Sequence, residues 1–566
     1  MVTSTAAMLA GLWGCEQPLG PAIRGQLRLV RIGDGLSATI AGYDEPVQIR
    51  SGAPTEVRFA LPDGLGEFRG HLRGDADAVS GHWIQPPRVI AGDRTATPVA
   101  LSASGPGVWT GDVVPLDELL SLYASIAQER DGGLTAYVRN PEYNFGRGML
   151  YRVVAEGCRV RLVSSGDSED DPHGTYDAAA DRLMLTFPGL GLDLLFTRRK
   201  RTEAAGFYPR PVPGEVYSYR QPEAAADGWQ TASLEQEGIA EQPICELVQS
   251  LIDREPAQLA TPCLQGLLIA RHGRLVLEEY FHGFDRERPH DMRSASKTFA
   301  SLLVGIASEA GAPLDENTPV YSLFPEYGDL VALDRRRAAM TVAHLMTMTS
   351  GLACDDYDDA SPGNEDRLQS QTEEPDWFRY TLGLPLANMP GTKYAYCSAA
   401  VNLLGGVIRN AVGTWLPEYF RQRVAEPLQM GRYHINLMPT GDAYMGGGMH
   451  LRPRDMLKLG QLHLDQGCWN GRRIVSADWV RRATTPRVAL PDGSHDGYNW
   501  HCHQYTVGGR ALREYDASGN GGQLVMVFPD LDLVVAITAG NYGQYGIWRR
   551  FRDELVPERI VAAVRR

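Results

Sequence analysis

Apolar and polar residues alternate in short runs between residues 25 and 199, and turns rich in Gly, Asp and Pro separate these runs. A period of two is typical of half-buried β-strands. The clearest predicted strands are 27–32, 36–41, 57–61, 160–163 and 183–187. Segment 116–128 differs, because Leu119, Leu120 and Tyr123 fall at helical spacing and predict a helix. We therefore expect a mainly-β N-terminal domain over residues 1–215, either a barrel or a sandwich.

Residues 209–228 are rich in Pro, Ala and Gly and have no clear periodicity, which predicts a domain boundary. Beyond this stretch the pattern changes to hairpins and long helices. Segments 266–271 and 275–280 flank a His272-Gly273 turn, and a second hairpin is predicted over 524–538, followed by a last helix over 547–564. Strands at both ends of a helical middle predict an α+β domain over 216–566, with an antiparallel sheet packed by helices.

Length and charge narrow the classes of protein. A chain of 566 residues is too long for one compact core, so at least two domains are expected. The net charge of -14 disfavours nucleic acid as a partner. No uncharged apolar run reaches the roughly 18 residues of a membrane span. We predict a soluble protein, cytoplasmic or exported with its signal absent or trimmed, and the oligomeric state is open. The apolar stretch 6–15 is interpreted as a first strand, with a lipoprotein-type signal at Cys15 as the alternative.

Lysine is rare, since only four of the 55 basic residues are Lys. An ammonium can lose its proton when buried, whereas a guanidinium cannot, so a retained Lys is a candidate for chemistry. Lys297 follows Ser294 by three residues, directly ahead of a segment with a strongly apolar helical face. Residues i and i+3 of a helix share one side, and the helix N-terminus offers N–H groups to an oxyanion. This layout indicates an activated serine nucleophile, with an N-capping serine beside a solvated lysine as the alternative.

Two later segments add to this pattern. Tyr396 lies just before a predicted apolar helix, where a phenol near Lys297 could move a proton between the serine and a leaving group. The alternative is a half-buried structural tyrosine. Near the C-terminus, the Gly-rich run 518–523 precedes the strand 524–528, and a strand N–H at such a point can complete an oxyanion hole.

The order Ser-x-x-Lys, then Tyr about a hundred residues on, then a Gly-rich strand start resembles the serine β-lactamase-related hydrolases. These include class C β-lactamases, penicillin-binding proteins, and similar esterases and amide hydrolases. The resemblance extends from about residue 240 to 566 and implies a β-lactamase/transpeptidase-like fold. Further stretches that carry it are 278–281, 344–352, 446–448, 454–456 and 531–542.

Carried over by position, the resemblance makes Ser294 the acylated nucleophile, Lys297 its general base and Tyr396 the proton relay. It assigns the oxyanion hole to the N–H groups of Ser294 and Gln523. No cofactor and no metal are implied.

The resemblance also predicts which residues contact the substrate: Ser398, Asn520, Gly521 and Gly522. Two motifs at these positions depart from the family pattern. The Tyr-x-Asn motif here ends in Ser398, and the Lys-Thr-Gly motif of β-lactamases reads Asn520-Gly521-Gly522. The second departure removes the cation that would hold a β-lactam carboxylate, which disfavours efficient β-lactam hydrolysis.

We therefore predict a serine hydrolase that cleaves an ester or amide bond of a small or peptide-like substrate through an acyl-enzyme. The alternatives are a transesterase, a β-lactamase or D,D-peptidase, and a non-catalytic binding protein on the same scaffold. The role of the N-terminal domain is open.

Three weaker features stand beside this prediction. Cys354 and Cys397 could form a disulfide at the site or be two buried thiols. His501 and His503 would share one face of a strand, which is half of a metal site, and we interpret them as ordinary histidines without a metal. The acidic run 355–359 is interpreted as a solvated loop, with a substrate-facing loop or a calcium site as alternatives.

Overall fold

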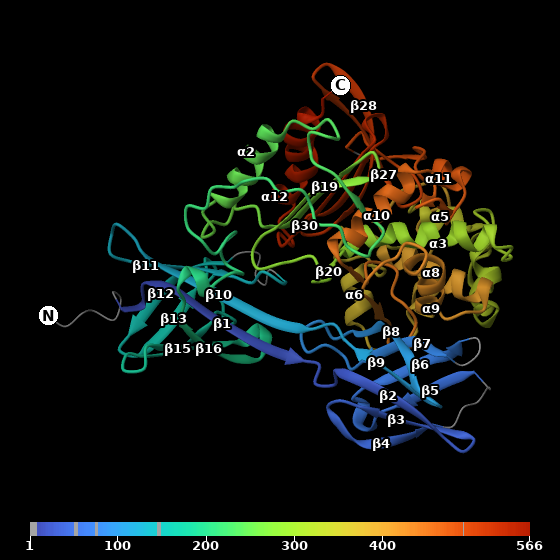
Figure 1. Ribbon diagram of the computed structural model, residues 1–566, viewed down its shortest axis with the longest axis horizontal. Helices are drawn as coiled ribbons and strands as arrows, with labels where there is room; N and C mark the ends of the chain where they lie inside the picture. Colours follow the sequence, from blue (N-terminus) through green and yellow to red (C-terminus); the bar gives the residue numbers. More distant parts are fainter. Residues whose placement is uncertain (1–7, 50–54, 74–76, 144–148, 491, 566) are drawn as a thin grey trace.

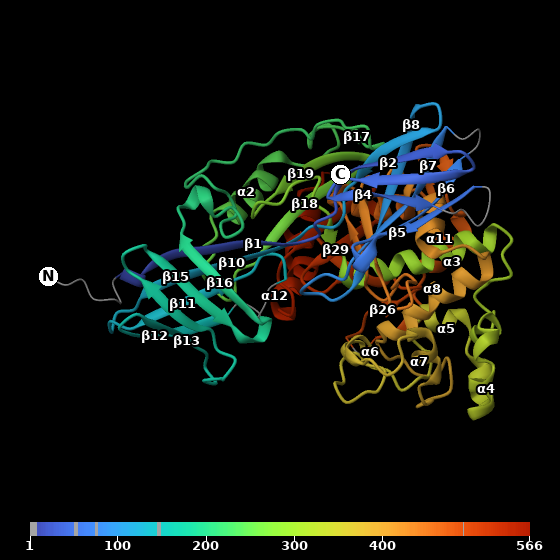
Figure 2. The same cartoon turned by 90° about the horizontal axis from the view of Figure 1, so that it is seen from below.

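The computed structural model describes residues 8–49, 55–73, 77–143, 149–490 and 492–565. Figures 1 and 2 show a β-barrel at one end of the molecule, a larger mixed body at the other, and a further β-sheet packed beside that body. Within the described residues, no helix combines the length and apolar character needed to cross a membrane.

The barrel confirms one of the two predicted forms of the N-terminal β structure. Strand β1 (Gly11–Gly20) pairs on one side with β10 (Glu118–Gln128) and on the other with β16 (Leu192–Arg198), which closes the ring. The strands between them follow in chain order: β11 (Leu134–Arg139), β12 (Met149–Glu156), β13 (Arg159–Val163), β14 (His173–Asp177) and β15 (Arg182–Phe187). Trp13 and Phe196 are fully buried in the barrel core.

The helix predicted over 116–128 is wrong, because this segment is strand β10. Its two faces are both covered: Leu120, Leu122 and Ala124 face the barrel core, while Tyr123 packs against Phe207 in a separate cluster. A strand that is buried on both faces has a continuous apolar run, and periodicity alone does not distinguish such a run from a buried helix.

A second β unit is inserted between β1 and β10. Its strands are β2 (Gly25–Ile32), β3 (Gly35–Ile40), β4 (Tyr43–Ile49), β5 (Glu56–Ala60), β6 (Glu67–Arg73), β7 (Ala78–Gln85), β8 (Arg94–Gly105) and β9 (Val108–Val113). Strand β8 pairs with β21 (Tyr433–Leu437), which continues through β22 (Met449–Leu451) to β20 (His290–Asp291). The inserted sheet is thus continuous with strands of the C-terminal half.

The C-terminal half is built on a nine-stranded sheet of order β17-β19-β18-β30-β29-β28-β27-β26-β25. Both predicted hairpins are present, as β18–β19 and β29–β30. All pairs are antiparallel except β17–β19. The strands are β17 (Gln230–Thr231), β18 (Leu264–Arg271), β19 (Arg274–Tyr280), β25 (Val488–Ala489), β26 (His495–Asp496), β27 (His501–Val507), β28 (Arg510–Gly519), β29 (Gln523–Phe528) and β30 (Leu533–Ala539).

Helices cover both faces of this sheet, as Figure 1 shows. Val534 and Ala536 of β30 pack with α3 (Lys297–Glu309), α8 (Ser398–Val412) and α10 (Pro453–Leu464). Val535 and Ile537, which alternate with them, pack with α2 (Glu241–Ile252) and the C-terminal helical segment. The α+β, β-lactamase-like architecture predicted from the sequence is therefore confirmed.

The remaining elements are short. The predicted last helix is divided into α12 (Tyr545–Arg550), the π-helical η11 (Phe551–Ile560) and η12 (Val561–Ala563), and Pro557 inside η11 lacks the N–H that a regular α-helix requires. The others are η1 (Pro62–Gly64), η3 (Pro188–Leu190), η4 (Arg201–Glu203), η5 (Arg293–Ser296), η6 (Val320–Leu323), η7 (Pro325–Tyr327), α4 (Asp329–Leu333), η8 (Arg335–Ala339), α5 (Val342–Met346), α6 (Glu365–Ser370), α7 (Trp377–Gly383), α9 (Leu416–Phe420), η9 (Arg421–Ala425), β23 (Cys468–Trp469), β24 (Arg472–Arg473), α11 (Ala477–Ala483) and η10 (Pro529–Leu531).

Candidate active site

Ser294 lies in η5, the single turn that leads into helix α3. Lys297, the first residue of α3, donates a hydrogen bond of 2.9 Å from Nζ to Ser294 Oγ and a second one to the carbonyl oxygen of Gly446. The i, i+3 spacing that the sequence suggested therefore brings the two side chains into contact.

Lys297 is buried, with only 2% of the residue exposed. This burial affects whether its amine carries a proton. Removal from water lowers the pKa of Lys297, while the carboxylates of Glu365 and Asp356 oppose this shift. The amine is thereby brought nearer to the neutral form that can accept a proton from a serine hydroxyl.

Tyr396 precedes helix α8, and its ring faces the same lysine. Lys297 Nζ lies 5.1 Å from the ring centroid. Burial raises the pKa of Tyr396 well above its ordinary value, and a hydrogen bond with Ser294 acts in the opposite direction. The phenol therefore stays protonated and can donate its proton while it accepts another.

Ser294 and Tyr396 line a cleft of about 310 Å³, and Lys297 is buried behind them. Ser294 lies on its wall beside the end of strand β28, where Ser518, Gly519 and Asn520 also line the cleft. A Cβ atom at Gly519 would clash with the carbonyl oxygen of Met292 and lie 3.1 Å from the backbone nitrogen of Ala295. The glycine thus lets the strand lie directly against the turn that carries the serine.

The structure brings only part of the predicted substrate-contact set to the cleft. Asn520 lines it, whereas Ser398, Gly521, Gly522 and Gln523 are absent from its lining. Each of the four is packed elsewhere: the N–H of Ser398 donates to Asp356, Gly521 pairs with Asn541, Gly522 packs against Phe551, and the Gln523 side chain binds the backbone of Ala539. The cleft-lining part of the Gly-rich run is 518–520, two residues earlier than the run 520–522 that the resemblance predicted.

The acidic residues in the cleft lining include Asp356, Glu365 and Asp366. Asp356 Oδ1 accepts a 3.0 Å hydrogen bond from the backbone N–H of Glu365. Burial, with the charge of Glu365, raises the pKa of Asp356 to about 6. The interpretation of the acidic run as a solvated loop is therefore wrong in part, because Asp356 and Tyr357 line the cleft while Asp358 and Asp359 are exposed.

The cleft lining also contains cations whose position there the sequence analysis missed: His501, Arg549 and Arg552. His501 Nδ1 lies 2.6 Å from Asp496 Oδ1. Burial disfavours the imidazolium, but Asp496 outweighs it and raises the pKa of His501 to about 9. Arg549 is exposed, and its guanidinium lies against the rings of Tyr545 and Trp548. The cleft therefore has cations although the Lys of the Lys-Thr-Gly motif is missing.

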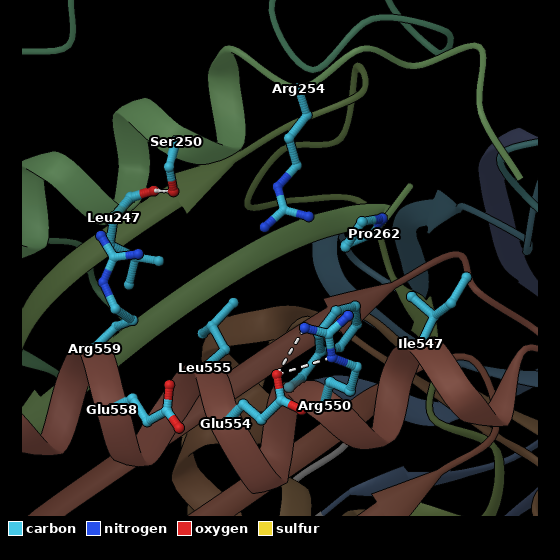
Figure 3. A pocket seen from close by; sticks show the side chains of 11 residues that line it. Leu247, Ser250, Arg254, Pro262, Ile547, Arg550, Glu554, Leu555, Glu558 and Arg559 are labelled. Carbon is cyan, nitrogen blue, oxygen red and sulfur yellow. Dashed lines mark hydrogen bonds and ion pairs between the residues drawn. The ribbon is translucent and has the colours of Figure 1, made fainter. Parts of the chain in front are cut away.

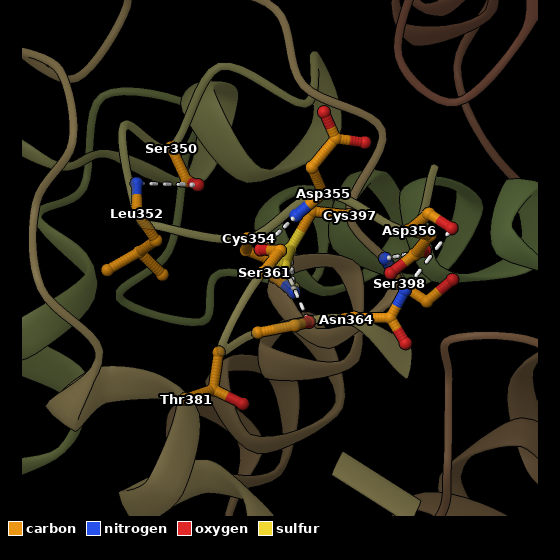
Figure 4. Close-up of a disulfide and its surroundings, with 12 residues drawn as sticks. Ser350, Leu352, Cys354, Asp355, Asp356, Ser361, Asn364, Thr381, Cys397 and Ser398 are labelled. Atoms are coloured by element: carbon orange, nitrogen blue, oxygen red, sulfur yellow. Dashed lines mark hydrogen bonds between the residues drawn. A yellow bond between two sulfur atoms is a disulfide. The ribbon is translucent and has the colours of Figure 1, made fainter. Parts of the chain in front are cut away.

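Figure 4 shows the disulfide between Cys354 and Cys397, whose Cα atoms are 5.5 Å apart. Of the two alternatives left open by the sequence, the bonded one is present. Cys397 directly follows Tyr396, and Cys354 directly precedes the acidic run 355–359. The bond fixes the loop that carries Asp356 against the start of helix α8.

A second hollow lies between α2 and the C-terminal helical segment (Figure 3). It is lined by Leu247, Arg254 and Leu555, together with an ion pair between Arg550 and Glu554. It shares no lining residue with the Ser294 cleft. We assign it no part in the chemistry.

A sequence model of the beta-lactamase family matches residues 248–547, a span that contains Ser294, Lys297 and Tyr396. The chain belongs to the beta-lactamase family. This membership supports a serine hydrolase of the type shared by β-lactamases, penicillin-binding proteins and esterases. The N-terminal barrel and the inserted sheet lie outside the matched residues.

Individual proteins are similar to part of this chain. A 6-aminohexanoate-dimer hydrolase of Paenarthrobacter ureafaciens is 24% identical over 375 residues, which is 59% of this chain and 91% of that protein. Among solved structures, EstCE1, a hydrolase with promiscuous acyltransferase activity, covers 56% of this chain and 97% of its own, with 18% identity and a TM-score of 0.43. A penicillin-binding protein homologue from Caulobacter crescentus covers 53% and 91%, with 15% identity and a TM-score of 0.41.

Proposed function

We propose that this protein is a serine hydrolase that cleaves an ester or amide bond through an acyl-enzyme on Ser294. The observation that carries the proposal is the 2.9 Å hydrogen bond between Lys297 Nζ and Ser294 Oγ at the wall of a cleft. A buried lysine with a lowered pKa beside a serine hydroxyl is the arrangement that activates a serine without a histidine.

The reaction proceeds in two halves. Neutral Lys297 accepts the proton of Ser294 Oγ as this oxygen attacks the carbonyl carbon, and Tyr396 donates its proton to the leaving alcohol or amine as the bond to it breaks. Lys297 returns a proton to the Tyr396 oxygen. Water then attacks the acyl-enzyme and gives one proton to the same pair, which protonates Ser294 Oγ as its bond to the acyl carbon breaks and the acid leaves.

The oxyanion hole is proposed to combine the N–H of Ser294 with that of Asn520, in place of the Gln523 N–H expected from the sequence. Gly519 pairs with Gln523 of β29, and the N–H of Gly522 bonds to the carbonyl of Gly519. Because backbone groups alternate in direction along a strand, those of the residues on either side of Gly519 are directed away from β29. Both neighbours of Gly519 line the cleft.

The charge distribution of the cleft supports a substrate class. Asp356, Glu365 and Asp366 suit an ammonium group, and Arg549 with the His501 imidazolium suits a carboxylate. The similar protein from Paenarthrobacter is named for hydrolysis of a 6-aminohexanoate dimer, a linear amide with one group of each kind. We propose a small amide or ester that carries an amine at one end and a carboxylate at the other.

The alternatives make distinct predictions. A transesterase would use the same residues and pass the acyl group to an added alcohol or amine. A β-lactamase or D,D-peptidase would form an adduct with penicillin. The missing motif lysine disfavours this alternative, whereas the cations at His501 and Arg549 favour it. A binding protein on this scaffold would bind ligands without turnover.

The test is intact-mass spectrometry after treatment with a fluorophosphonate, together with turnover of p-nitrophenyl butyrate. We expect one adduct on Ser294, and a loss of turnover of at least about a thousandfold in Ser294→Ala and Lys297→Ala. Ser296→Ala and Lys393→Ala are the matched controls, because Ser296 bonds to the Arg293 carbonyl and Lys393 is exposed outside the cleft. An adduct or turnover that survives in Ser294→Ala would refute the proposal.

A further inference from the structure

Three side chains with metal-binding atoms project from one face of the β27–β28 hairpin. His503 lies on β27, and Glu514 and Asp516 lie on β28. His503 is directly opposite Glu514, and His501 is opposite Asp516. Since alternate residues of a strand share a face, all of these side chains are on the same side of the sheet. One atom each of His503, Glu514 and Asp516 lies within 4.8 Å of the others.

The two carboxylates are deeply buried, with Glu514 only 2% and Asp516 0% exposed. Among the described residues, neither oxygen of Glu514 has a hydrogen-bond partner. Asp516 Oδ2 lies 3.2 Å from His503 Nε2. Burying two carboxylates with so few hydrogen-bond donors is unfavourable for the free energy of folding unless a cation or a proton neutralises their charge.

We propose that His503, Glu514 and Asp516 form a binding site for one divalent transition-metal ion, for which Zn²⁺ is the best match. One imidazole and two carboxylates are ligands that zinc accepts, with water in the fourth position of a tetrahedron. Calcium and magnesium require six or more oxygen ligands, which this set does not supply. Zinc ligands at about 2.0 to 2.1 Å are roughly 3.4 Å apart, so the three side chains close inward when the ion binds.

The surroundings limit which other residues take part. His501 is held by Asp496 through the 2.6 Å contact and is not free to turn towards the ion. Arg552, the neighbouring cation, donates a 2.7 Å hydrogen bond to Asp553 and is an electrostatic partner of Asp516 without a hydrogen bond to it. Its single charge does not supply the donors that Glu514 lacks.

A bound proton is the alternative to a metal ion for neutralising the negative charge of this site. Burial and the charge of Asp516 raise the pKa of Glu514 well above its ordinary value. Metal binding would displace that proton, whereas a site that is satisfied by the proton would bind no metal. The number of metal ions bound per chain, and not the enzymatic activity, distinguishes the metal-bound site from the protonated one.

A bound ion would connect β27 to β28 one short step from the cleft, since Ser518 and His501 on the same face line it. The ion takes no part in the proposed chemistry. Its effect would be to stabilise the hairpin whose end carries the proposed oxyanion donor.

The experiment is isothermal titration of Zn²⁺ into the full-length chain after dialysis against a chelator, with metal analysis of the loaded protein. We expect one equivalent of zinc, a raised melting temperature, and affinity at least about tenfold lower in His503→Gln and Glu514→Gln. His495→Gln is the matched control, because His495 is an exposed histidine of the adjacent strand β26. Mg²⁺ and Ca²⁺ should bind at least about tenfold more weakly than Zn²⁺.

The near-isosteric Glu514→Gln variant guards against misfolding as an explanation, since it removes a buried charge and keeps the side-chain shape. Its melting temperature without metal should equal or exceed that of the wild type, while the zinc-induced increase disappears. Absence of stoichiometric binding, binding that is the same in all three variants, or a preference for Mg²⁺ or Ca²⁺ would overturn the proposal. None of these results depends on hydrolase activity.

Discussion

The Asp356 carboxylate accepts a 2.8 Å hydrogen bond from the backbone N–H of Ser398, the first residue of helix α8. The N–H of Asp356 in turn donates to the carbonyl of Tyr396 at 2.8 Å. The acidic loop and the proposed proton relay are therefore held together by two backbone contacts. The carboxylate lies beside the position where related hydrolases have the Asn of the Tyr-x-Asn motif.

Asp356→Asn is expected to shift the pH–rate profile. The amide can still accept the bond from Ser398, but it removes one of the negative charges that support protonated Lys297. The pKa of Lys297 then falls further, so the acidic limb of kcat/KM for p-nitrophenyl butyrate moves to lower pH. Asp358→Asn, at an exposed position of the same run, should leave the limb in place. An equal shift in both variants would contradict this account.

Arg549→Gln is expected to separate charged from neutral substrates. If Arg549 holds a substrate carboxylate, its loss raises KM for the 6-aminohexanoate dimer by about tenfold and leaves p-nitrophenyl butyrate nearly unaffected. The control is Arg550→Gln, since the Arg550 guanidinium pairs with Glu554 at the other hollow. An equal rise in KM for both substrates would show that Arg549 does not bind the substrate carboxylate.

The His501–Asp496 pair is expected to make stability depend on pH on the alkaline side. The folded-state pKa of His501 is raised to about 9 from an ordinary value near 6.5, so its contribution is complete below about pH 6.5 and lost as pH rises through about 9. The contribution is roughly 3 kcal/mol at most. Melting temperatures of wild type and His501→Gln should therefore differ at pH 6 and converge above about pH 9. A constant difference across this window would exclude the linkage.

Gly519→Ala tests the close approach of β28 to the serine turn. The added methyl group meets the Met292 carbonyl, so either the strand or η5 must move. We expect turnover to fall by at least about tenfold and the melting temperature by a few degrees. Gly383→Ala is the comparison, because a Cβ there meets no atom within 4 Å. Normal turnover in Gly519→Ala would mean that this contact does not position the serine.

Loss of the disulfide is expected to destabilise the loop that carries Asp356. The bond closes a separation of 43 residues, which corresponds to about 4 kcal/mol in the chain-entropy account. The double variant Cys354→Ala, Cys397→Ala should therefore melt earlier and turn over more slowly, because the constraint beside Tyr396 is lost. Cys158→Ala removes an exposed free thiol and should change neither property. Chemical denaturation followed by fluorescence measures the difference.

The parts of the site that were predictable from the sequence are local ones. Ser294 and Lys297 meet because i, i+3 spacing on a helical turn fixes their geometry, and the β18–β19 hairpin follows from a two-residue turn. Tyr396 was identified through the order of motifs and not through spacing, since about a hundred residues separate it from Ser294.

The parts that were missed depend on tertiary contacts. Asp356 and His501 reach the cleft from segments far apart in sequence, and their signals resembled a charged loop and ordinary histidines. Gln523 is absent from the cleft lining, and a run with several glycines does not fix which of its residues faces the serine. Strand β10 was mistaken for a helix because both of its faces are buried.

The pairing of β8 with β21 makes the N-terminal sheet a structural part of the hydrolase. Ile435 lies opposite Ala96, and β22 connects this pair to β20, which ends three residues before Ser294. If the chain were cut ahead of the matched family segment, β21 would become an edge strand with unsatisfied backbone donors and acceptors next to buried apolar side chains. Such an edge recruits other strands, so we expect the isolated family segment to self-associate.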